Sequence, residues 1–332
     1  MKLARFVAPA AIAVLILLAA TAGWLWYTIY ADRSHPLVAK QVVIDQGSTF
    51  GAVAQELVAA GVIGNGTTFR VLARSLGQEA AVRAGEYRFG PHLTQSDVLH
   101  ALVTGGAQVA AWVTIPEGFT AAQIAARLQK VGIGPSRSFL LDFTRQRLVV
   151  DGVPTNGLEG FLFPSTYLVP LGASPQQVSA PMIAEFFKEL PGDARQQGRT
   201  LHVTIPQAVT IASLVEREAK SELDRPRIAE VIYNRLALGM PLQVDATIEY
   251  ALPHHKSQLS YADLKIDSPY NTYAHPGLPP TPIANPGRPS LEAAFHPAKG
   301  DDIYYVYCGN GRHIFAKTLV QHQANVARCL GS

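Results

Sequence analysis

The sequence is poor in cysteine and in charge, with 2 cysteines among its 332 residues and 16% Asp, Glu, Lys and Arg. It contains no run of basic residues, no zinc-finger spacing and no glycine-rich phosphate loop. A net charge of +3 is too small to indicate a nucleic-acid partner, and we expect none. No two histidines have the His-Glu-x-x-His spacing of a metal hydrolase. We therefore expect neither a metal nor a cofactor.

A long uncharged stretch lies close to the N-terminus. No charged residue occurs within 6–30, which is about the length that crosses a bilayer. Lys2 and Arg5 precede it, and the positive-inside rule places them in the cytoplasm. A cleaved signal peptide is the alternative, but the apolar character continues well past the candidate cleavage region at 19–22. We expect residues 1–31 to form a cytoplasmic tip and an uncleaved, single-pass anchor in the inner membrane, with the remaining chain in the periplasm.

Hydrophobic periodicity predicts two α+β domains after this anchor, a small one at 32–108 and a larger mixed one at 109–332. The smaller domain should contain strand, helix, helix, strand and helix, at 40–44, 49–61, 67–76, 84–89 and after the N-cap Thr94. The larger domain should begin with a strand at 109–114, followed by helices at 121–131, 136–143, 175–189, 205–218 and 226–238. We expect an exposed connection at 192–200 and little regular structure at 241–297.

The helix expected at 205–218 carries two glutamates in its last turns, Glu216 and Glu218. At about 100° per residue, Glu218 falls on the flank of the apolar face, whereas Glu216 points further round. A carboxyl group carried onto a buried face has a raised pKa, which keeps it protonated and able to act as a general acid. The alternative for either glutamate is a solvated charge in a surface ion pair, such as Glu218 with Lys220.

The irregular stretch 241–297 is rich in proline, tyrosine, asparagine and aspartate, which favours a cleft-lining loop over disorder. Sugars are bound by flat aromatic rings and by amides or carboxylates that hydrogen-bond their hydroxyls. The candidate sugar-binding residues of this stretch are Gln243, Asp245, Tyr250, Tyr270, Asn271 and Tyr273. Each of them, taken alone, also fits a role in fixing the loop backbone.

Several long motifs occur in a fixed order: ASLVEREA at 212–219, NRL at 234–236, LQVD at 242–245, SPYNTY at 268–273 and GLPPTPIANP at 277–286. Others are EGFLFPSTY at 159–167, AAFHP at 293–297, IYYVYC at 303–308 and HIFA at 313–316. This series resembles the YceG-like (MltG) family of endolytic murein transglycosylases. The resemblance covers nearly everything after the anchor. It implies a LysM-like glycan-binding module at 32–108, for which a structural spacer is the alternative. It also implies a substrate-side role for Glu159, a structural or substrate-side role for Asn234, and association with cell-wall synthases.

The same resemblance implies a membrane-anchored lyase that cuts the MurNAc–GlcNAc bond of nascent peptidoglycan strands in cell-wall biogenesis and ends their polymerisation. Such an enzyme needs one acid/base, because the C6 hydroxyl of the muramic acid attacks the anomeric carbon and forms a 1,6-anhydro ring. Glu218 is our candidate for this acid/base, and Glu216 is the second candidate. Two other functions stay open: a non-catalytic peptidoglycan-binding scaffold, and a muramidase hydrolase that uses Glu218 together with Asp245.

Cys308 and Cys329 fall in the exported part of the chain. An oxidising compartment permits a disulfide, which would tie the strand at 303–308 to the C-terminal helix. Two buried free thiols are the alternative.

Overall fold

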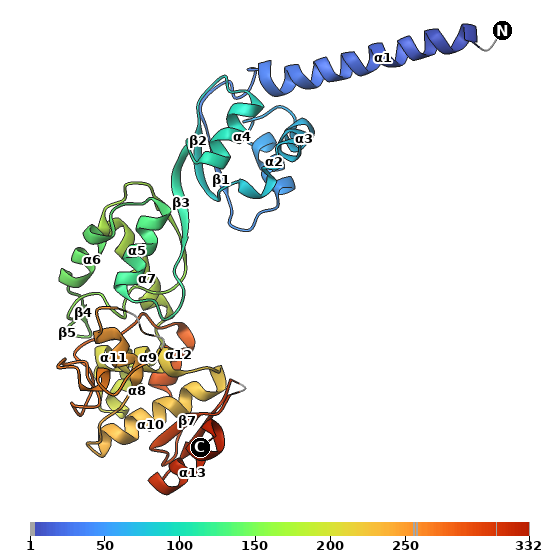
Figure 1. Cartoon of the computed structure of the whole chain (residues 1–332). Coiled ribbons are helices and arrows are strands. Elements are labelled where there is room, and N and C mark those ends of the chain that lie inside the picture. The colour runs from blue at the N-terminus through green and yellow to red at the C-terminus, as the bar shows by residue number, and fades with distance from the viewer. Residues whose placement is uncertain (1–3, 255, 257, 310, 332) are drawn as a thin grey trace. The chain divides into compact units, whose positions relative to one another are not determined.

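The computed structural model describes residues 4–254, 256, 258–309 and 311–331, so Lys2 lies outside the described residues. The chain divides into two compact units (Figure 1). The first unit contains the chain up to Val113 together with Tyr167–Leu171, and the second contains Thr114–Thr166 and the chain from Gly172 onward.

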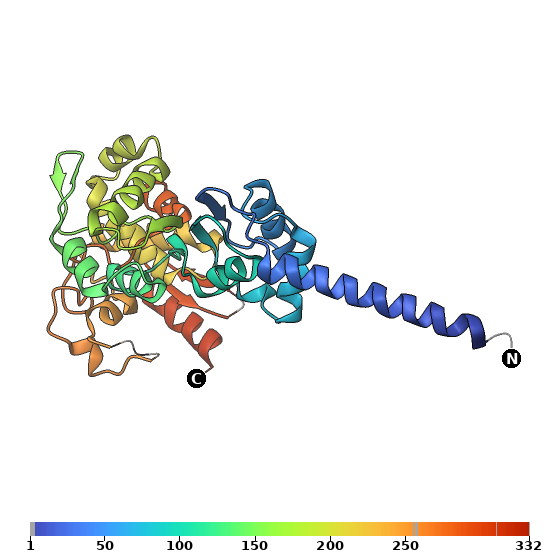
Figure 2. The ribbon, with the colours of Figure 1, turned by 90° about the horizontal axis from the view of Figure 1, so that it is seen from above.

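The first unit begins with α1 (Ala4–Trp26), which continues into a short π-helix, η1 (Tyr27–Ala31). Figure 2 shows α1 as one uninterrupted helix. The stretch Ala11–Ala31, with a mean hydropathy of 2.0, is long and apolar enough to cross a membrane. Ile29 of η1 is buried, and it belongs to the hydrophobic core of this unit.

The strand–helix–helix–strand–helix order expected for the small domain is present. Its elements are β1 (Lys40–Ile44), α2 (Phe50–Ala59), α3 (Gly66–Ser75), η2 (Glu79–Ala81), β2 (Gly85–Phe89) and α4 (Gln95–Thr104). The strands β1 and β2 are antiparallel, with Lys40 opposite Phe89. The side chains of Thr49, Asn65 and Thr94 cap α2, α3 and α4, because each accepts a hydrogen bond from a backbone N–H in the first turn of its helix.

Two further strands complete a sheet of order β1-β2-β3-β6, in which β3 is Gln108–Thr114 and β6 is Thr166–Pro170. Hydrophobic periodicity predicted the 109–114 strand as part of the larger domain. In the structure β3 pairs antiparallel with β2, and its residues up to Val113 belong to the first unit. The chain therefore leaves the first unit along β3 and returns to it in β6.

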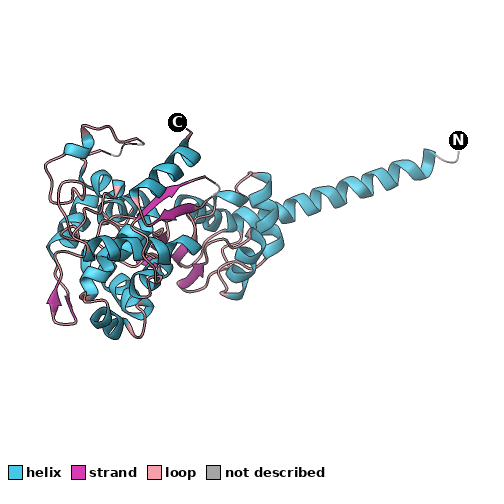
Figure 3. Ribbon diagram, turned by 90° about the horizontal axis from the view of Figure 1, so that it is seen from below, coloured by secondary structure: helices cyan, strands magenta, loops and turns pink. Residues whose placement is uncertain are grey.

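The second unit is mostly helical. Its helices are α5 (Ala121–Val131), α6 (Ser136–Arg145), α7 (Pro175–Glu189), α8 (Ala194–Thr200), α9 (Ile205–Glu218), η3 (Glu222–Asp224), α10 (Arg225–Ala237), α11 (Asp245–Ala251), η4 (Asp263–Lys265), α12 (Arg288–Phe295) and α13 (Leu319–Leu330). Its strands form two hairpins, β4 (Val149–Val150) with β5 (Val153–Pro154), and β7 (Tyr304–Tyr307) with β8 (His313–Ala316). Figure 3 shows these strands in magenta, and the β7–β8 hairpin packs against α13.

Helix α9 is the central element of this unit. Its residues from Ala208 to Val215 are all buried, and it packs against α8, α10, α11 and α12. A capping box of Thr204 and Gln207 defines where α9 begins, and Pro206 between them occupies its first turn. Because α9 is covered on every side until Val215, its C-terminal turn is where it can present side chains to a cleft.

Two segments expected to be irregular contain short helices, although most of 241–297 is irregular and most of 192–200 is exposed. The segment 192–200 contains α8, and the segment 241–297 contains α11, η4 and α12. These helices have three to eight residues, too few for a periodic pattern to stand out. Tertiary packing stabilises them instead: α8 packs against α9 and α12, and both α11 and α12 pack against α9.

Candidate active site

Glu218 is the last residue of α9 and keeps partial contact with solvent. Its Oε2 accepts a hydrogen bond of 3.1 Å from the hydroxyl of Tyr305 in β7. Burial raises the pKa of Glu218 to about 7. The Tyr305 hydrogen bond acts in the opposite sense, and the negative charge of Asp245 adds to the rise. At neutral pH this carboxyl group is therefore divided between its acidic and basic forms.

Arg235 holds together the segments that surround Tyr305. Although it is a charged residue near the end of α10, only 8% of it is exposed. Its Nε donates to the carbonyl of Ile303, 2.7 Å away, just before β7, and its Nη1 donates to the carbonyl of Leu242, 2.8 Å away. No sequence pattern pointed to this role of Arg235. Its clustered bonds to backbone carbonyls position both β7 and the chain entering α11.

The chain entering α11 carries two of the predicted sugar-binding residues, Gln243 and Asp245, and both are exposed. Gln243 has φ +53°, an uncommon conformation for a residue with a side chain, and its N–H donates to the carbonyl of Thr272. Such positions recur at functional sites. Asp245 accepts a hydrogen bond from the hydroxyl of Tyr273. The structure thus brings Glu218, Asp245 and Tyr273 into one neighbourhood, because the charge of Asp245 acts on Glu218 and the charge of Glu218 acts on Tyr273. Gln243 lies two residues before Asp245 in the chain.

Asn271 and Asn234 do not fit the expected contact with a sugar. Asn271 is completely buried, donates to the carbonyls of Leu264 and Ile266, and accepts the N–H of Tyr273. The amide of Asn234 donates to the carbonyls of Gly300 and Asp302. Both side chains fix loop backbone, so Asn271 supports the site by holding Tyr273 in place.

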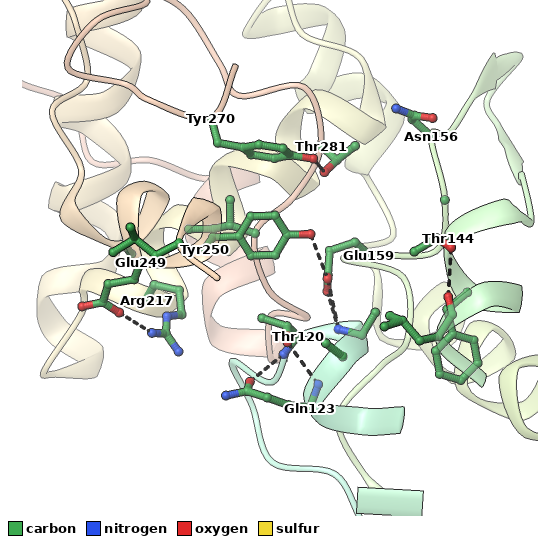
Figure 4. A pocket seen from close by; sticks show the side chains of 18 of the residues that line it. Thr120, Gln123, Thr144, Asn156, Glu159, Arg217, Glu249, Tyr250, Tyr270 and Thr281 are labelled. Atoms are coloured by element: carbon green, nitrogen blue, oxygen red, sulfur yellow. Dashed lines mark hydrogen bonds and ion pairs between the residues drawn. The ribbon is translucent and has the colours of Figure 1, made fainter. Parts of the chain in front are cut away.

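Three other predicted residues, Glu159, Tyr250 and Tyr270, line a separate pocket of about 670 Å³ (Figure 4). The two tyrosine rings lie 4.9 Å apart, centre to centre. On the opposite side of the pocket from Glu159, Arg217 and Glu249 form an ion pair of 2.9 Å. Glu218 is not among the residues that line the pocket. The predicted site residues therefore divide into a Glu218 group and this pocket group.

Glu159 is almost completely buried, and burial raises its pKa to about 7. Its carboxylate accepts three kinds of donor: the N–H of Ala121 at the start of α5, the amide of Asn285 and the hydroxyl of Tyr250. These bonds join α5, α11 and the segment before α12. Glu159 thus fixes the wall of the pocket, and the ring of Tyr250, whose hydroxyl it binds, faces the pocket.

The expectation that Glu216 points away from the buried face is wrong. Its side chain is only 7% exposed and lies 3.8 Å from Arg225, and its Oε2 accepts the N–H of Gly287, 3.1 Å away. Glu117 lies nearby, and burial together with the charge of Glu216 raises the pKa of Glu117. Segments 115–120 and 285–288 cover this side of α9, which helical periodicity alone does not reveal. The ion pair with Arg225 and the Gly287 contact give Glu216 a structural role.

Two further residues of the site, Tyr305 and Asn285, were not predicted, although both lie within the YceG-like motifs of the sequence. Tyr305 belongs to a strand in which tyrosines repeat, so nothing local distinguishes it from Tyr304 or Tyr307. At the end of the same strand, Cys308 is joined by a disulfide to Cys329 of α13.

Comparison with known proteins places this geometry in a family. The model of the YceG-like family matches residues 42–328. An endolytic murein transglycosylase of Bacillus subtilis (strain 168) is 34% identical over 297 residues, which are 84% of this chain and 81% of that protein. One of Streptococcus pneumoniae serotype 2 is 29% identical, over 96% of this chain and 64% of that protein.

A solved structure agrees with these matches. The crystal structure of a putative YceG-like protein from Listeria monocytogenes has 31% sequence identity and a TM-score of 0.63, and the match covers 86% of this chain and 98% of that one. The family model, the sequence relatives and the solved structure thus agree over most of the chain, as the ordered motifs predicted. This chain belongs to the YceG-like family.

Proposed function

We propose that this protein is a membrane-anchored lytic transglycosylase that cuts peptidoglycan glycan strands internally, with Glu218 as its general acid and base. The observation that carries the proposal is the setting of Glu218. It is a carboxyl group with a pKa of about 7, at the end of a buried helix, hydrogen-bonded by Tyr305 and within reach of the charge of the exposed Asp245. Relatives that share most of the chain are named endolytic murein transglycosylases.

The reaction requires one group that first gives and then takes a proton. Protonated Glu218 transfers its proton to the oxygen between MurNAc and GlcNAc, and the bond from that oxygen to the anomeric carbon of MurNAc breaks. The C6 hydroxyl of the same MurNAc then attacks the anomeric carbon and gives its proton to the carboxylate of Glu218. This closes a 1,6-anhydro ring, regenerates the acid and consumes no water. A pKa near 7 suits both halves of this cycle at neutral pH.

Substrate contacts are proposed for two regions. Asp245 and Tyr273, whose electrostatic interactions reach Glu218, present a carboxylate and an aromatic ring to the sugars, and the nearby Gln243 presents an amide. The pocket of Tyr250 and Tyr270 holds a further part of the strand, since its aromatic and polar lining suits a carbohydrate. In this proposal Glu159 acts through Tyr250, because its oxygens already accept protein donors.

A hydrolase that uses Glu218 and Asp245 is the competing function. The hydrogen bond from Tyr273 to Asp245 favours the lyase, because an aspartate engaged in this way is less available to activate water. The masses of the products separate the two reactions: the lyase leaves anhydro ends and the hydrolase leaves reducing ends. A binding scaffold would leave the strands uncut.

The decisive experiment is digestion of purified peptidoglycan by the wild type, Glu218→Gln and Glu216→Gln. Glu218→Gln keeps the shape of the side chain but has no proton to donate, so we expect anhydromuropeptide release to fall about 10²- to 10⁴-fold. Circular dichroism checks the folding of each variant. Glu216→Gln should lose less activity, through disturbed packing against Arg225 and Gly287. Near-normal turnover by Glu218→Gln would refute the assignment, and Asp245 or Glu159 would become the next candidate acid.

The anchor and the first unit complete the proposal. We propose that Ala11–Ala31 spans the inner membrane once and that the chain after it lies in the periplasm, where the protein takes part in ending glycan polymerisation beside cell-wall synthases. Full-length protein in the membrane fraction and an active C-terminal phosphatase fusion are the expected results.

We further propose that the first unit contains a LysM-like glycan-binding module. Its strand–helix–helix–strand order and a groove of about 360 Å³ lined by α2 and α3 support this role.

A further inference from the structure

The β7–β8 hairpin delivers one hydroxyl group to the proposed acid/base. Tyr305 lies 87 residues after Glu218 in the sequence, and its hydroxyl is 3.1 Å from Oε2 of Glu218. Among the described residues no hydrogen-bond donor contacts the other oxygen, Oε1. The two oxygens of Glu218 are therefore not equivalent: one is held by the protein and the other is available.

The ring of Tyr305 is itself held from several sides. His313 of β8 meets it edge to face, with centroids 5.6 Å apart and an interplanar angle of 88°. His313 is fixed in turn by Asp224, whose Oδ2 accepts both the backbone N–H and Nδ1–H of His313, at 2.8 and 3.0 Å. Phe315 lies on the same strand, directly opposite Tyr305 in the hairpin. A tyrosine supported in this way can orient a neighbouring carboxyl group without moving itself.

The hydroxyl of Tyr305 lowers the pKa of Glu218, whereas most of the surroundings of this glutamate raise it. Burial raises the pKa of this glutamate, and Asp245 and Glu249 of α11 act in the same sense. Lys220, which follows α9, and the Tyr305 hydroxyl lower it. Tyr273 also faces the group, and its own pKa is raised in part by the charge of Glu218. A hydroxyl that donates to the carboxylate stabilises the ionised form, which the second half of the cycle needs.

We propose that Tyr305 is a positioning residue for Glu218: its hydroxyl holds Oε2, so that Oε1 is the oxygen that exchanges the proton with the glycan. This inference rests on the proposed function of Glu218. It adds a role for the C-terminal hairpin, which contributes a side chain to the catalytic neighbourhood although it lies far from α9 in the sequence.

The test compares Tyr305→Phe with Tyr307→Phe in the full chain, purified in detergent. Both changes remove one hydroxyl from the same strand, but the hydroxyl of Tyr307 meets only the N–H of Gly311 at 3.4 Å within the described residues. For Tyr305→Phe we expect anhydromuropeptide release at pH 7 to fall by about 10- to 100-fold, as for a misplaced catalytic group. The basic limb of its pH–rate profile should move to higher pH by about half to one unit, the effect of losing one hydrogen bond to the carboxylate. Tyr307→Phe should match the wild type in both respects.

A second readout measures Glu218 without substrate. Carbon-13 labelled glutamate gives a carboxyl resonance whose titration can be followed by NMR, and the signal absent from Glu218→Gln identifies residue 218. Its midpoint should rise in Tyr305→Phe and stay unchanged in Tyr307→Phe. A wild-type profile and an unchanged titration in Tyr305→Phe would overturn the inference and leave Glu218 as the acid. If Glu218→Gln itself retained activity, the proposed function would fail, and the titration would still decide whether Tyr305 controls Glu218.

Discussion

Keeping Glu218 desolvated should cost the protein stability at neutral and alkaline pH, and replacing it by glutamine should restore that stability. The pKa of Glu218 rises from the ordinary 4.5 to about 7 in the folded state. Below pH 4.5 the group is protonated in both states, so it imposes no penalty. Between pH 4.5 and about pH 7, Glu218 is ionised in the unfolded chain but stays protonated in the folded protein. Folding stability therefore falls as pH rises, and the loss is complete above about pH 7.

The expected magnitude follows from this difference in pKa. A rise in the pKa of Glu218 from 4.5 to about 7 lowers the free energy of unfolding by about 3 kcal/mol at pH 8. At pH 5 the same shift lowers it by less than about 1 kcal/mol. Glu218→Gln carries no charge at either pH and can still accept the hydroxyl of Tyr305. Its stability advantage over the wild type should therefore grow by about 2.5 kcal/mol between pH 5 and pH 8. For a unit of this size, that is a difference of about 5–10 °C in Tm.

Scanning calorimetry in detergent is the appropriate assay. All three tryptophans, Trp24, Trp26 and Trp112, lie in the first unit, so tryptophan fluorescence does not follow unfolding of the second. Other titrating groups, including Glu159, are common to both proteins and cancel in the comparison. Glu185→Gln on the surface of α7 controls for the loss of a carboxylate as such. A stability difference between Glu218→Gln and the wild type that stays constant from pH 5 to pH 8 would refute the reasoning.

Two further predictions concern how the second unit is held together. Asn285 is completely buried, accepts the N–H groups of Gly160 and Leu162, and donates to Phe119 and Glu159. Asn285→Ala should leave several of these groups unpaired and cost at least about 3 kcal/mol, measured by thermal unfolding; a loss below 1 kcal/mol would show that water replaces the amide. Replacing Cys308 and Cys329 together by serine should cost about 2–4 kcal/mol. Thiol labelling without prior reduction should detect no free thiol in the wild type, and quantitative labelling would contradict the disulfide.

Local sequence patterns determined the parts of this protein that depend on neighbours along the chain. Seven of the described α-helices begin at a residue whose side chain caps them, and the cap at Thr94 was predictable because its partner lies three residues away. The apolar N-terminal stretch was visible for the same reason. The YceG-like motifs placed the chain in its family because they are long and occur in a fixed order.

Only the tertiary structure decided which side chains meet. Periodicity placed Glu218 at the edge of the buried face, but it also placed Glu216 outside that face, where two distant segments in fact cover it. Asn271 was predicted to bind sugar, but its side chain fixes the loop backbone at Leu264 and Ile266. No sequence pattern predicts the turn that brings these partners to it. The bond from Tyr305 to Glu218 spans 87 residues, and the bond from Asn285 to Glu159 spans 126. Contacts over such separations arise when α9, the hairpin and the loops pack against one another, and the local sequence around either partner does not encode them.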